Sequence, residues 1–301
     1  MKSNKKILPI SIILPTYNRL FVLKKMLPEY LALPVEEVIV INDASSDGTM
    51  DYLDSITNNR LKVVHHKIRR YLPAARNSGI NIASQPYILM GEDDVIMNED
   101  YVETLFREIK EFKADIIAGR LIALEKNETT QQAFERVNNN PPPQLFYPER
   151  LSCDFSYIPE KAIKTPMIHA CSLFKTEWAK NYPYCEDYRG NALREESHFY
   201  FTCFRNGAEI FFTPSAVAFH MYHDYAGGCR GNQFLYLMSS IKNNHRFLNC
   251  FWRDLKQLPE INFSRISLEL HLIYNSTFNT LAHTIRTHFP RVHRFLKRKK
   301  D

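Results

Sequence analysis

Residues 37–49 read E-V-I-V-I-N-D-A-S-S-D-G-T, a run of branched apolar side chains followed by polar, turn-forming ones. A short continuous apolar run bounded by turn residues is typical of a strand buried on both faces, as in a parallel sheet. Asn42 and Asp43 stand directly after the run, and Asp47-Gly48 has the composition of a tight turn. The stretch predicts a buried strand over residues 37–41, a loop, and a short helix over residues 49–56.

The same alternation continues on both sides of this stretch. A further buried strand is expected over residues 10–14, two more strands over residues 61–65 and 87–90, and helices over residues 20–31, 74–83 and 98–112. Asn18 is expected to cap the first of these helices, and Pro28 to bend or shorten it. Strands alternating with helices at this spacing indicate βαβ units. The predicted fold class is therefore α/β, with a mostly parallel sheet flanked by helices.

The rest of the chain gives a coarser pattern. Residues 126–150 are polar and then rich in proline, which predicts a long surface loop. Residues from 234 onward have helical periodicity. With 45% hydrophobic and 24% charged residues among 301, the composition is that of an ordinary globular protein.

The net charge of +6 is concentrated at the C-terminus. Residues 284–301 contain a single acid, Asp301, and seven basic residues: Arg286, Arg291, Arg294, Lys297, Arg298, Lys299 and Lys300. This segment carries the whole excess, so the remainder of the chain is balanced. A general nucleic-acid-binding surface is therefore not indicated, and we expect no nucleic-acid partner.

Cysteine spacing and the N-terminal segment bear on the compartment. None of the six cysteines forms a C-x-x-C pair, so no zinc ribbon or thioredoxin-like site is indicated, and reduced thiols are expected. Residues 7–14 are interrupted by Pro9 and Ser11 and lack the features of a signal peptide. No run of eighteen apolar residues occurs. These observations favour a cytoplasmic protein.

Polar clusters follow three of the predicted strands: Pro15-Thr16-Tyr17-Asn18-Arg19, Asn42-Asp43 and Glu92-Asp93-Asp94. In open α/β sheets, ligands bind at the carboxyl ends of strands. Carboxylates with hard oxygen atoms suit Mg²⁺ or Mn²⁺, and three adjacent acids repel one another unless a cation offsets them. The acidic triplet alone is equally compatible with a solvated turn before a helix.

Two further side chains can be read in two ways. Asp43 could accept hydrogen bonds from a base or ribose, or could form an Asx turn. Arg76 and Asn77 are expected to open a helix beside the same crevice, where a cation and a helix N-terminus could both face phosphates. Alternatively, Arg76 is a surface arginine.

Four segments, I-L-P-T-Y-N-R, V-I-V-I-N-D-A-S-S-D-G-T, A-A-R-N-S-G-I-N-I-A and Y-I-L-M-G-E-D-D-V, together resemble the family-2 glycosyltransferases with the GT-A fold. Their order and spacing match over residues 8–115, and weaker similarity continues to about residue 230. The resemblance implies a GT-A domain over residues 1–230, with a nucleotide-binding half (1–125) and an acceptor half (126–230). Residues 231–301 are expected to form a helical extension with a basic amphipathic tail.

The resemblance also implies roles for individual residues. Asp43 matches the base-binding aspartate, Arg76 is placed near the nucleotide and diphosphate, and the nucleotide-contacting loop holds Pro15, Thr16, Tyr17 and Arg19. Glu92 and Asp93 fall on the donor side of the D-x-D-type element, and Asp94 and His220 are the implied metal ligands. Glu196 is in the place of the general base, or Glu195 if the register slips by one.

Two positions depart from the family pattern. Glu92 stands where aspartate is usual, which changes the metal geometry, and His198 stands where a second downstream acid is common. These departures leave open a catalytically inactive, nucleotide-sugar-binding protein. A sugar-phosphate nucleotidyltransferase would need a glycine-rich phosphate loop after the first strand, and residues 15–19 contain no glycine.

The resulting hypothesis is an inverting glycosyltransferase that uses Mn²⁺ or Mg²⁺. It moves a sugar from a nucleotide-sugar donor, UDP-sugar favoured, to a hydroxyl of a glycan or lipid-linked glycan acceptor. In residues 284–301, Ile285, Phe289, Val292, Phe295 and Leu296 are interleaved with the basic residues. This pattern is compatible with peripheral contact with an anionic membrane at its inner face, and equally with a solvated basic terminus.

Overall fold

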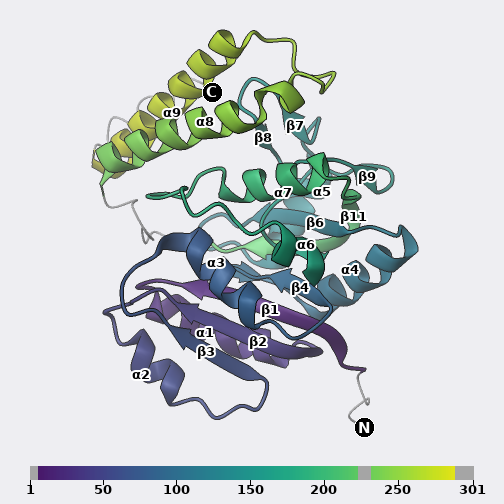
Figure 1. Ribbon diagram of the computed structural model, residues 1–301, viewed down its shortest axis with the longest axis vertical. Helices are drawn as coiled ribbons and strands as arrows, with labels where there is room; N and C mark the ends of the chain where they lie inside the picture. The colour runs from purple at the N-terminus through teal and green to yellow at the C-terminus, as the bar shows by residue number, and fades with distance from the viewer. Residues whose placement is uncertain (1–5, 223–231, 289–301) are drawn as a thin grey trace.

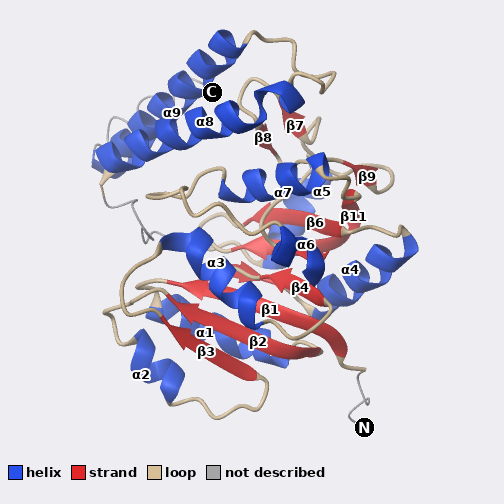
Figure 2. Ribbon diagram, viewed as in Figure 1, coloured by secondary structure: helices blue, strands red, loops and turns tan. Residues whose placement is uncertain are grey.

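The computed structural model describes residues 6–222 and 232–288, and for residues 279 and 282–288 it describes the backbone alone. Its centre is a mixed sheet with helices on both faces (Figures 1 and 2). The first half of the sheet is parallel, in the order β3-β2-β1-β4. These strands are β1 (Leu8–Thr16), β2 (Val35–Asn42), β3 (Leu61–His65) and β4 (Tyr87–Met90).

The second half of the sheet continues from β4 through β10 (Ser172–Lys175), β6 (Ile116–Ala123) and β11 (Ile210–His220). β10 is antiparallel to both neighbours, whereas β6 and β11 are parallel. Two short strands, β5 (Val95–Ile96) and β9 (Ile163–Lys164), pair antiparallel with β11. A separate hairpin joins β7 (Phe146–Tyr147) to β8 (Ser152–Cys153). The predicted α/β class with a mostly parallel sheet is confirmed.

Successive side chains of a buried strand point to opposite faces of the sheet, so each face must be covered by helices. Ile12 and Leu14 of β1 pack in the core shared with α1 (Leu20–Ala32) and α4 (Glu99–Glu111). Ile13 points to the other face, which is covered by α3 (Tyr71–Ile82), α6 (Thr176–Asn181) and α7 (Glu195–Arg205). The short helix α2 (Thr49–Asp54) lies between β2 and β3. Both faces of β1 are therefore buried.

A helical hairpin follows the sheet. α8 (Gln233–Leu255) and α9 (Arg265–His288) pack against each other and against α7. Phe247 and Phe251 of α8 contact Phe201 of α7, and Leu268 and Leu272 of α9 complete the same cluster. In the described ranges, no helix is long and apolar enough to cross a membrane. The boundary placed at residue 230 falls in residues 223–231, outside the described ranges.

Several local predictions need correction. Asn18 does not cap α1, because its backbone is left-handed (φ 51°) and its side chain accepts from Ser46 N. Asp47 takes that role, since its Oδ2 accepts from Leu20 N at 2.8 Å. The helix is not shortened at Pro28 but continues to Ala32.

The predicted loop over residues 126–150 is also partly wrong. It contains α5 (Thr130–Asn139), which begins with a capping box between Thr129 and Gln132. The central strand β6 was not predicted either. The predictions for residues 284–301 fall largely outside the described part of the chain, because only the helical backbone of residues 284–288 is described.

Candidate active site

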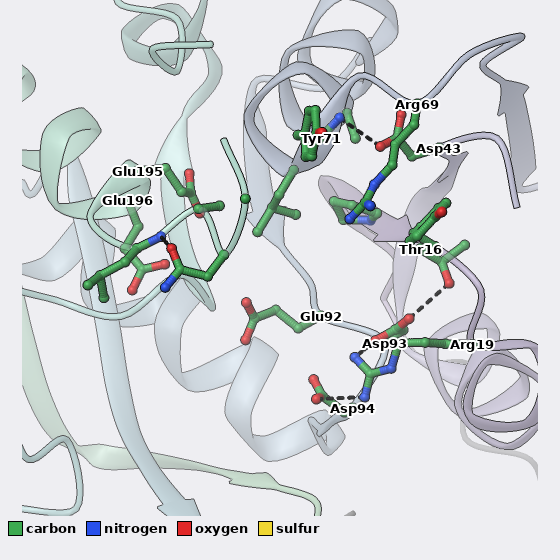
Figure 3. A pocket seen from close by; sticks show the side chains of 18 of the residues that line it. Thr16, Arg19, Asp43, Arg69, Tyr71, Glu92, Asp93, Asp94, Glu195 and Glu196 are labelled. Atoms are coloured by element: carbon green, nitrogen blue, oxygen red, sulfur yellow. Dashed lines mark hydrogen bonds and ion pairs between the residues drawn. The ribbon is translucent and has the colours of Figure 1, made fainter. Parts of the chain in front are cut away.

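A pocket of about 390 Å³ opens at the carboxyl ends of β1, β2 and β4. The loop before α7 and the first turn of that helix form the opposite wall, as Figure 3 shows. All but one of the predicted site residues line it: Pro15, Thr16, Tyr17, Arg19, Asp43, Glu92, Asp93, Asp94, Glu195, Glu196 and His220. The exception is Arg76. The structure therefore gathers side chains that are up to two hundred positions apart.

The loop after β1 holds the acidic triplet through hydrogen bonds and ion pairs. Thr16 Oγ1 donates to Asp93 at 2.8 Å. The guanidinium of Arg19 lies 2.5 Å from Asp93 and 2.9 Å from Asp94. Burial lowers the pKa of Arg19, but the charges of Asp93 and Asp94 outweigh it and raise the pKa above its ordinary value. Arg19 is thus paired with protein carboxylates at the pocket wall.

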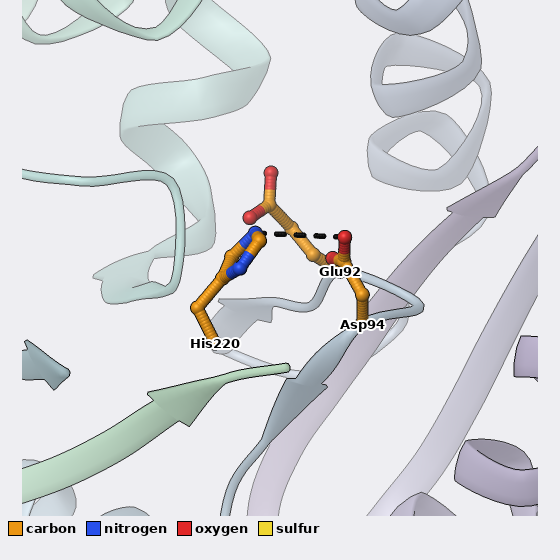
Figure 4. A group of neighbouring side chains, drawn as sticks. All are labelled: Glu92, Asp94 and His220. Carbon is orange, nitrogen blue, oxygen red and sulfur yellow. Dashed lines mark ion pairs between the residues drawn. The ribbon is translucent and has the colours of Figure 1, made fainter. Parts of the chain in front are cut away.

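Glu92, Asp94 and His220 converge at the base of the pocket (Figure 4). Each offers a ligand atom, and these atoms all lie within 4.8 Å of one another. His220 comes to this position because the end of β11 pairs with β5, which directly follows the triplet, with His220 opposite Val95. Its Nε2 lies 3.5 Å from Asp94 Oδ2.

This donor set fits the implied cofactor. Two carboxylates and one imidazole, with room for phosphate oxygens, suit Mn²⁺ or Mg²⁺. Glu92, predicted on the donor side with Asp93, lines the pocket and also stands with the metal-ligand candidates. Burial raises the pKa of Glu92 to about 8; Arg76 opposes this shift, and the charges of Asp94 and Glu196 add to it. A divalent cation is what would stabilise the charged form of this carboxylate.

Arg76 is fully buried behind the pocket wall. α3 begins at Tyr71, five residues earlier, so Arg76 does not open the helix and its guanidinium does not reach the pocket. It lies 2.9 Å from Glu195 and 3.2 Å from Glu92. Burial lowers the pKa of Arg76, but Glu195 and Glu92 together raise it well above its ordinary value. Arg76 was predicted to lie near the nucleotide and diphosphate; in the structure its guanidinium bridges two carboxylates.

The two candidate bases occupy different environments at the start of α7. Glu195 is buried and paired with Arg76, in a geometry that leaves Glu195 Oε2 and Arg76 Nε without a hydrogen-bond partner among the described residues. Glu196 is half-buried and faces the pocket (Figure 3). The left-handed backbone of Arg194 (φ 75°) sets the direction in which the helix begins. The carboxylate of Glu195 is thus paired with Arg76, whereas that of Glu196 faces the pocket.

Asp43 organises the loop before α3. Its Oδ1 lies 2.7 Å from His66 Nδ1 and accepts from Arg70 N, while Oδ2 accepts from Tyr71 N, both at 2.8 Å. These contacts make Asp43 a cap for α3 supplied from a distant strand end. The carboxylate still lines the pocket.

Sequence reasoning missed several lining residues. The guanidinium of Arg69 stacks over Tyr17 at 4.0 Å and over Tyr71 at 4.7 Å. Asn191 precedes α7, and Tyr236 reaches the pocket from α8. The basic and aromatic composition of R-R-Y at residues 69–71 was a usable signal for Arg69 and Tyr71. No sequence signal pointed to Tyr236, because its position depends on the packing of the helical hairpin.

The comparison with protein families decides the classification. The model described as "Glycosyl transferase family 2" matches residues 11–182, more than half of the chain. The chain belongs to glycosyltransferase family 2.

Curated relatives support the same family. Glycosyltransferase GlyA of Streptococcus pneumoniae is 30% identical over 122 residues, which are 40% of this chain and 18% of that protein. Glycosyltransferase GlyG of the same organism is 28% identical over 123 residues, 40% of this chain and 41% of that one. A poly-beta-1,6-N-acetyl-D-glucosamine synthase of Staphylococcus epidermidis is 34% identical over 107 residues, 35% of this chain and 25% of its own. The matches span well under half of these relatives.

Solved structures agree on the fold. Residues 1–349 of TarS from S. aureus, crystallised with UDP-GlcNAc, superpose with a TM-score of 0.57 at 15% identity, covering 90% of this chain and 72% of that one. The same fragment with UDP gives a TM-score of 0.55 at 16% identity, with the same coverage. At this identity, the likeness establishes the GT-A fold.

The chain departs from the family-2 pattern at His198, and the structure shows what this residue contacts. His198 lies outside the pocket, where its ring packs edge-on against Tyr188 and Phe251. Its Nδ1 is 3.1 Å from the hydroxyl of Tyr188. Burial lowers the pKa of His198 to about 4. In this family-2 member, position 198 therefore supports the contact between α7 and α8.

Proposed function

We propose that this chain is an inverting glycosyltransferase that moves a sugar from a nucleotide-sugar donor, UDP-sugar favoured, to a hydroxyl of a glycan or lipid-linked glycan. One observation carries the proposal: Glu196 faces the cluster of Glu92, Asp94 and His220 across a single pocket. A carboxylate base and a cluster suited to a cation are the two chemical elements that metal-assisted transfer requires. Neither alternative function is favoured by a feature of the site.

The donor is expected to lie along the wall formed by the strand ends. Tyr17, Arg69 and Asp43 provide aromatic, cationic and acceptor groups at one end of the pocket for a nucleoside. The diphosphate then extends toward Glu92, Asp94 and His220, which would hold a bound Mn²⁺ or Mg²⁺. When bound, the cation supplies charge neutralisation for the leaving diphosphate. The TarS structures that contain UDP-GlcNAc and UDP support a UDP-linked donor.

Glu196 is the proposed general base. It takes the proton from the acceptor hydroxyl as that oxygen attacks the anomeric carbon from the side opposite the leaving group. Direct attack by one acceptor inverts the anomeric centre. Glu195 suits this task less, because its carboxylate is buried and lies 2.9 Å from the guanidinium of Arg76. Its proposed role is to keep Arg76, and through it Glu92, in place.

Thermal shift with nucleotides tests the donor. A ligand that binds only the folded state, at about a hundred times its dissociation constant, adds about 2.7 kcal/mol to the free energy of unfolding. We expect UDP and UDP-sugars with Mn²⁺ to raise the melting temperature, and ADP to do so less. Absence of a shift with every nucleotide sugar and nucleoside diphosphate would contradict the proposal.

Donor hydrolysis tests the cluster. Asp94→Ala is expected to abolish Mn²⁺-dependent release of UDP from the donor. Asp100→Ala is the matched control, since it removes an exposed acid six residues later on α4. Equal hydrolysis by both variants would exclude the assigned cluster.

A further inference from the structure

The helical hairpin presents an apolar surface that no described part of the chain covers. On α9, Ile266, Leu270, Ile273, Tyr274, Phe278 and Leu281 are all exposed, Ile266 to 74%. Their spacing places them along one side of the helix. The buried Leu268 and Leu272 point the other way, into the cluster with α8. We call the six exposed residues, with Phe234, Leu235 and Met238 of α8, the apolar face.

One end of the apolar face lies on the turn of α8 that carries Tyr236, a residue that lines the active-site pocket. α8 and α9 run antiparallel, since Asn249 contacts Arg265, His245 contacts Glu269, and Asn244 lies near Ser276. The start of α8 therefore lies beside the end of α9, as Figure 1 also shows. At that end, Tyr236 lines the pocket while Phe234, two residues earlier, is 69% exposed.

Charge defines the kind of surface that fits this face. From Leu270 to Lys300 the sequence contains no Asp or Glu, while all seven basic residues of the C-terminal segment fall within 284–300. The two acids on the described hairpin helices are paired elsewhere, Asp254 with Arg205 and Glu269 with His245. An apolar helix side followed in the sequence by a basic stretch without acids suits a surface that is anionic outside and apolar beneath.

We propose that the apolar face docks onto an anionic phospholipid bilayer, with α9 lying along the interface. Leu270, Tyr274 and Phe278 would enter the boundary between headgroups and acyl chains, and the basic sequence of residues 284–300 would favour anionic lipid. The pocket mouth then lies at the membrane surface, within reach of an acceptor carried on a lipid. This last point rests on the proposed function; the docking itself does not.

Vesicle co-sedimentation of the full chain tests the docking. The variant Ile266→Gln/Leu270→Gln/Phe278→Gln replaces exposed residues with a good helix former. The control Phe21→Gln/Met50→Gln removes exposed apolar side chains from α1 and α2. On phosphatidylcholine vesicles containing phosphatidylglycerol, we expect the α9 variant to lose at least about tenfold in partitioning, and the control to match the wild type. Binding should fall when phosphatidylglycerol is omitted or salt is raised.

Three outcomes would overturn the docking: no vesicle binding by the wild type, equal binding by the α9 variant, or equal binding to neutral vesicles. Sedimentation equilibrium without lipid addresses the rival occupant. If the wild type self-associates, the α9 variant does not, and vesicles are not bound, the face is an interface between two copies. All binding is measured without nucleotide sugar. A protein that binds vesicles but no nucleotide sugar or nucleoside diphosphate would refute the proposed function and leave the docking intact.

Discussion

The side chain of Glu92 takes part in two networks at once. Its carboxylate belongs to the cluster with Asp94 and His220, and one of its oxygens lies 3.2 Å from the buried guanidinium of Arg76. Arg76 also contacts Glu195 at the start of α7. Glu92, Arg76 and Glu195 therefore form a line of alternating charges that joins the end of β4 to the start of α7. Glu92, which stands where the family resemblance implies an aspartate, is the residue that makes this connection.

The two adjacent glutamates of α7 are expected to respond differently to removal of their charge. Glu196→Gln should lower kcat by about 10²–10⁴ while leaving the dissociation constant for UDP unchanged, because a general base acts in the chemical step. Glu195→Gln should instead lower the melting temperature, because it leaves the buried Arg76 without its nearest counter-charge. Steady-state kinetics, UDP titration and thermal melts on both variants measure this. A larger kcat loss in Glu195→Gln would reverse the assignment.

His169 is expected to make the fold sensitive to acid. It is buried, its Nε2 donates to Gly119 O at 2.8 Å, and burial lowers its pKa to about 4. The unfolded chain binds a proton at this residue near pH 6.5, whereas the folded chain does not until near pH 4. The contribution of His169 is thus complete above pH 6.5 and is lost as the pH falls toward 4.

The loss should be about 1.4 kcal/mol per pH unit in that window. Urea unfolding of wild type and His169→Gln between pH 4 and pH 7 measures it, with the variant showing the shallower dependence. The exposed His245→Gln is the control and should keep the wild-type slope. Identical slopes in the wild type and the His169 variant would contradict this account.

At the scale of elements, two contacts position α3: Gly79 lies close to β1, and Asp43 at the end of β2 caps the start of the helix. A Cβ on Gly79 would stand 2.4 Å from Ile13 Cγ2, so the glycine lets the helix lie against β1. At the other end, Asp43 accepts from the first two backbone N–H groups around Tyr71. Together these contacts put Arg76 behind the pocket. The glycine in the A-A-R-N-S-G segment therefore has a packing role.

Gly79→Ala is expected to destabilise the protein. Overpacking against the buried Ile13 outweighs the better helix propensity of alanine, for a net loss of about 1–2 kcal/mol. Asn81→Ala, at an exposed position of the same helix, is the control and should change the free energy of unfolding by less than about 0.5 kcal/mol. Equilibrium urea denaturation compares them. A stabilised Gly79→Ala would mean that Ile13 moves aside at little cost.

At the scale of the whole molecule, the helical hairpin is part of the active-site wall. Asn243 of α8 donates to Arg189 O and to Asn191 Oδ1, at 3.1 and 3.2 Å. Arg194 reaches across to Asn244 Oδ1 at 2.8 Å and to the carbonyl of Leu151. The loop that leads into α7 is thereby fixed from a helix that lies beyond the family match. Loss of these contacts should therefore shift the residues of this loop that line the pocket.

Asn243→Ala is expected to lower kcat/KM about tenfold with less than about a twofold change in the dissociation constant for UDP. It removes both hydrogen bonds from Asn243 to the loop, which should also cost about 1–3 kcal/mol of stability. Lys242→Ala, at the exposed neighbouring position, is the control and should leave both quantities near wild type. Unchanged kcat/KM in Asn243→Ala would show that the loop holds its position without α8.

The sequence by itself determined the local pattern. The strands at residues 61–65 and 87–90 were predicted at their observed bounds, and most residues of the polar clusters at strand ends line one pocket. These features follow from periodicity and from the geometry of parallel sheets, which act over a few residues. Local patterns were less informative over residues 126–150, where the capping box of α5 was overlooked among polar residues.

The tertiary structure alone decided which of these side chains meet. Glu92 joins Asp94 and His220 because β11 pairs with β5, and Arg76 is buried because Gly79 lets α3 approach β1. Tyr236 reaches the pocket because the hairpin packs on α7. Each of these contacts joins positions far apart in the chain. They are set by the packing of whole elements, which no short window of residues encodes.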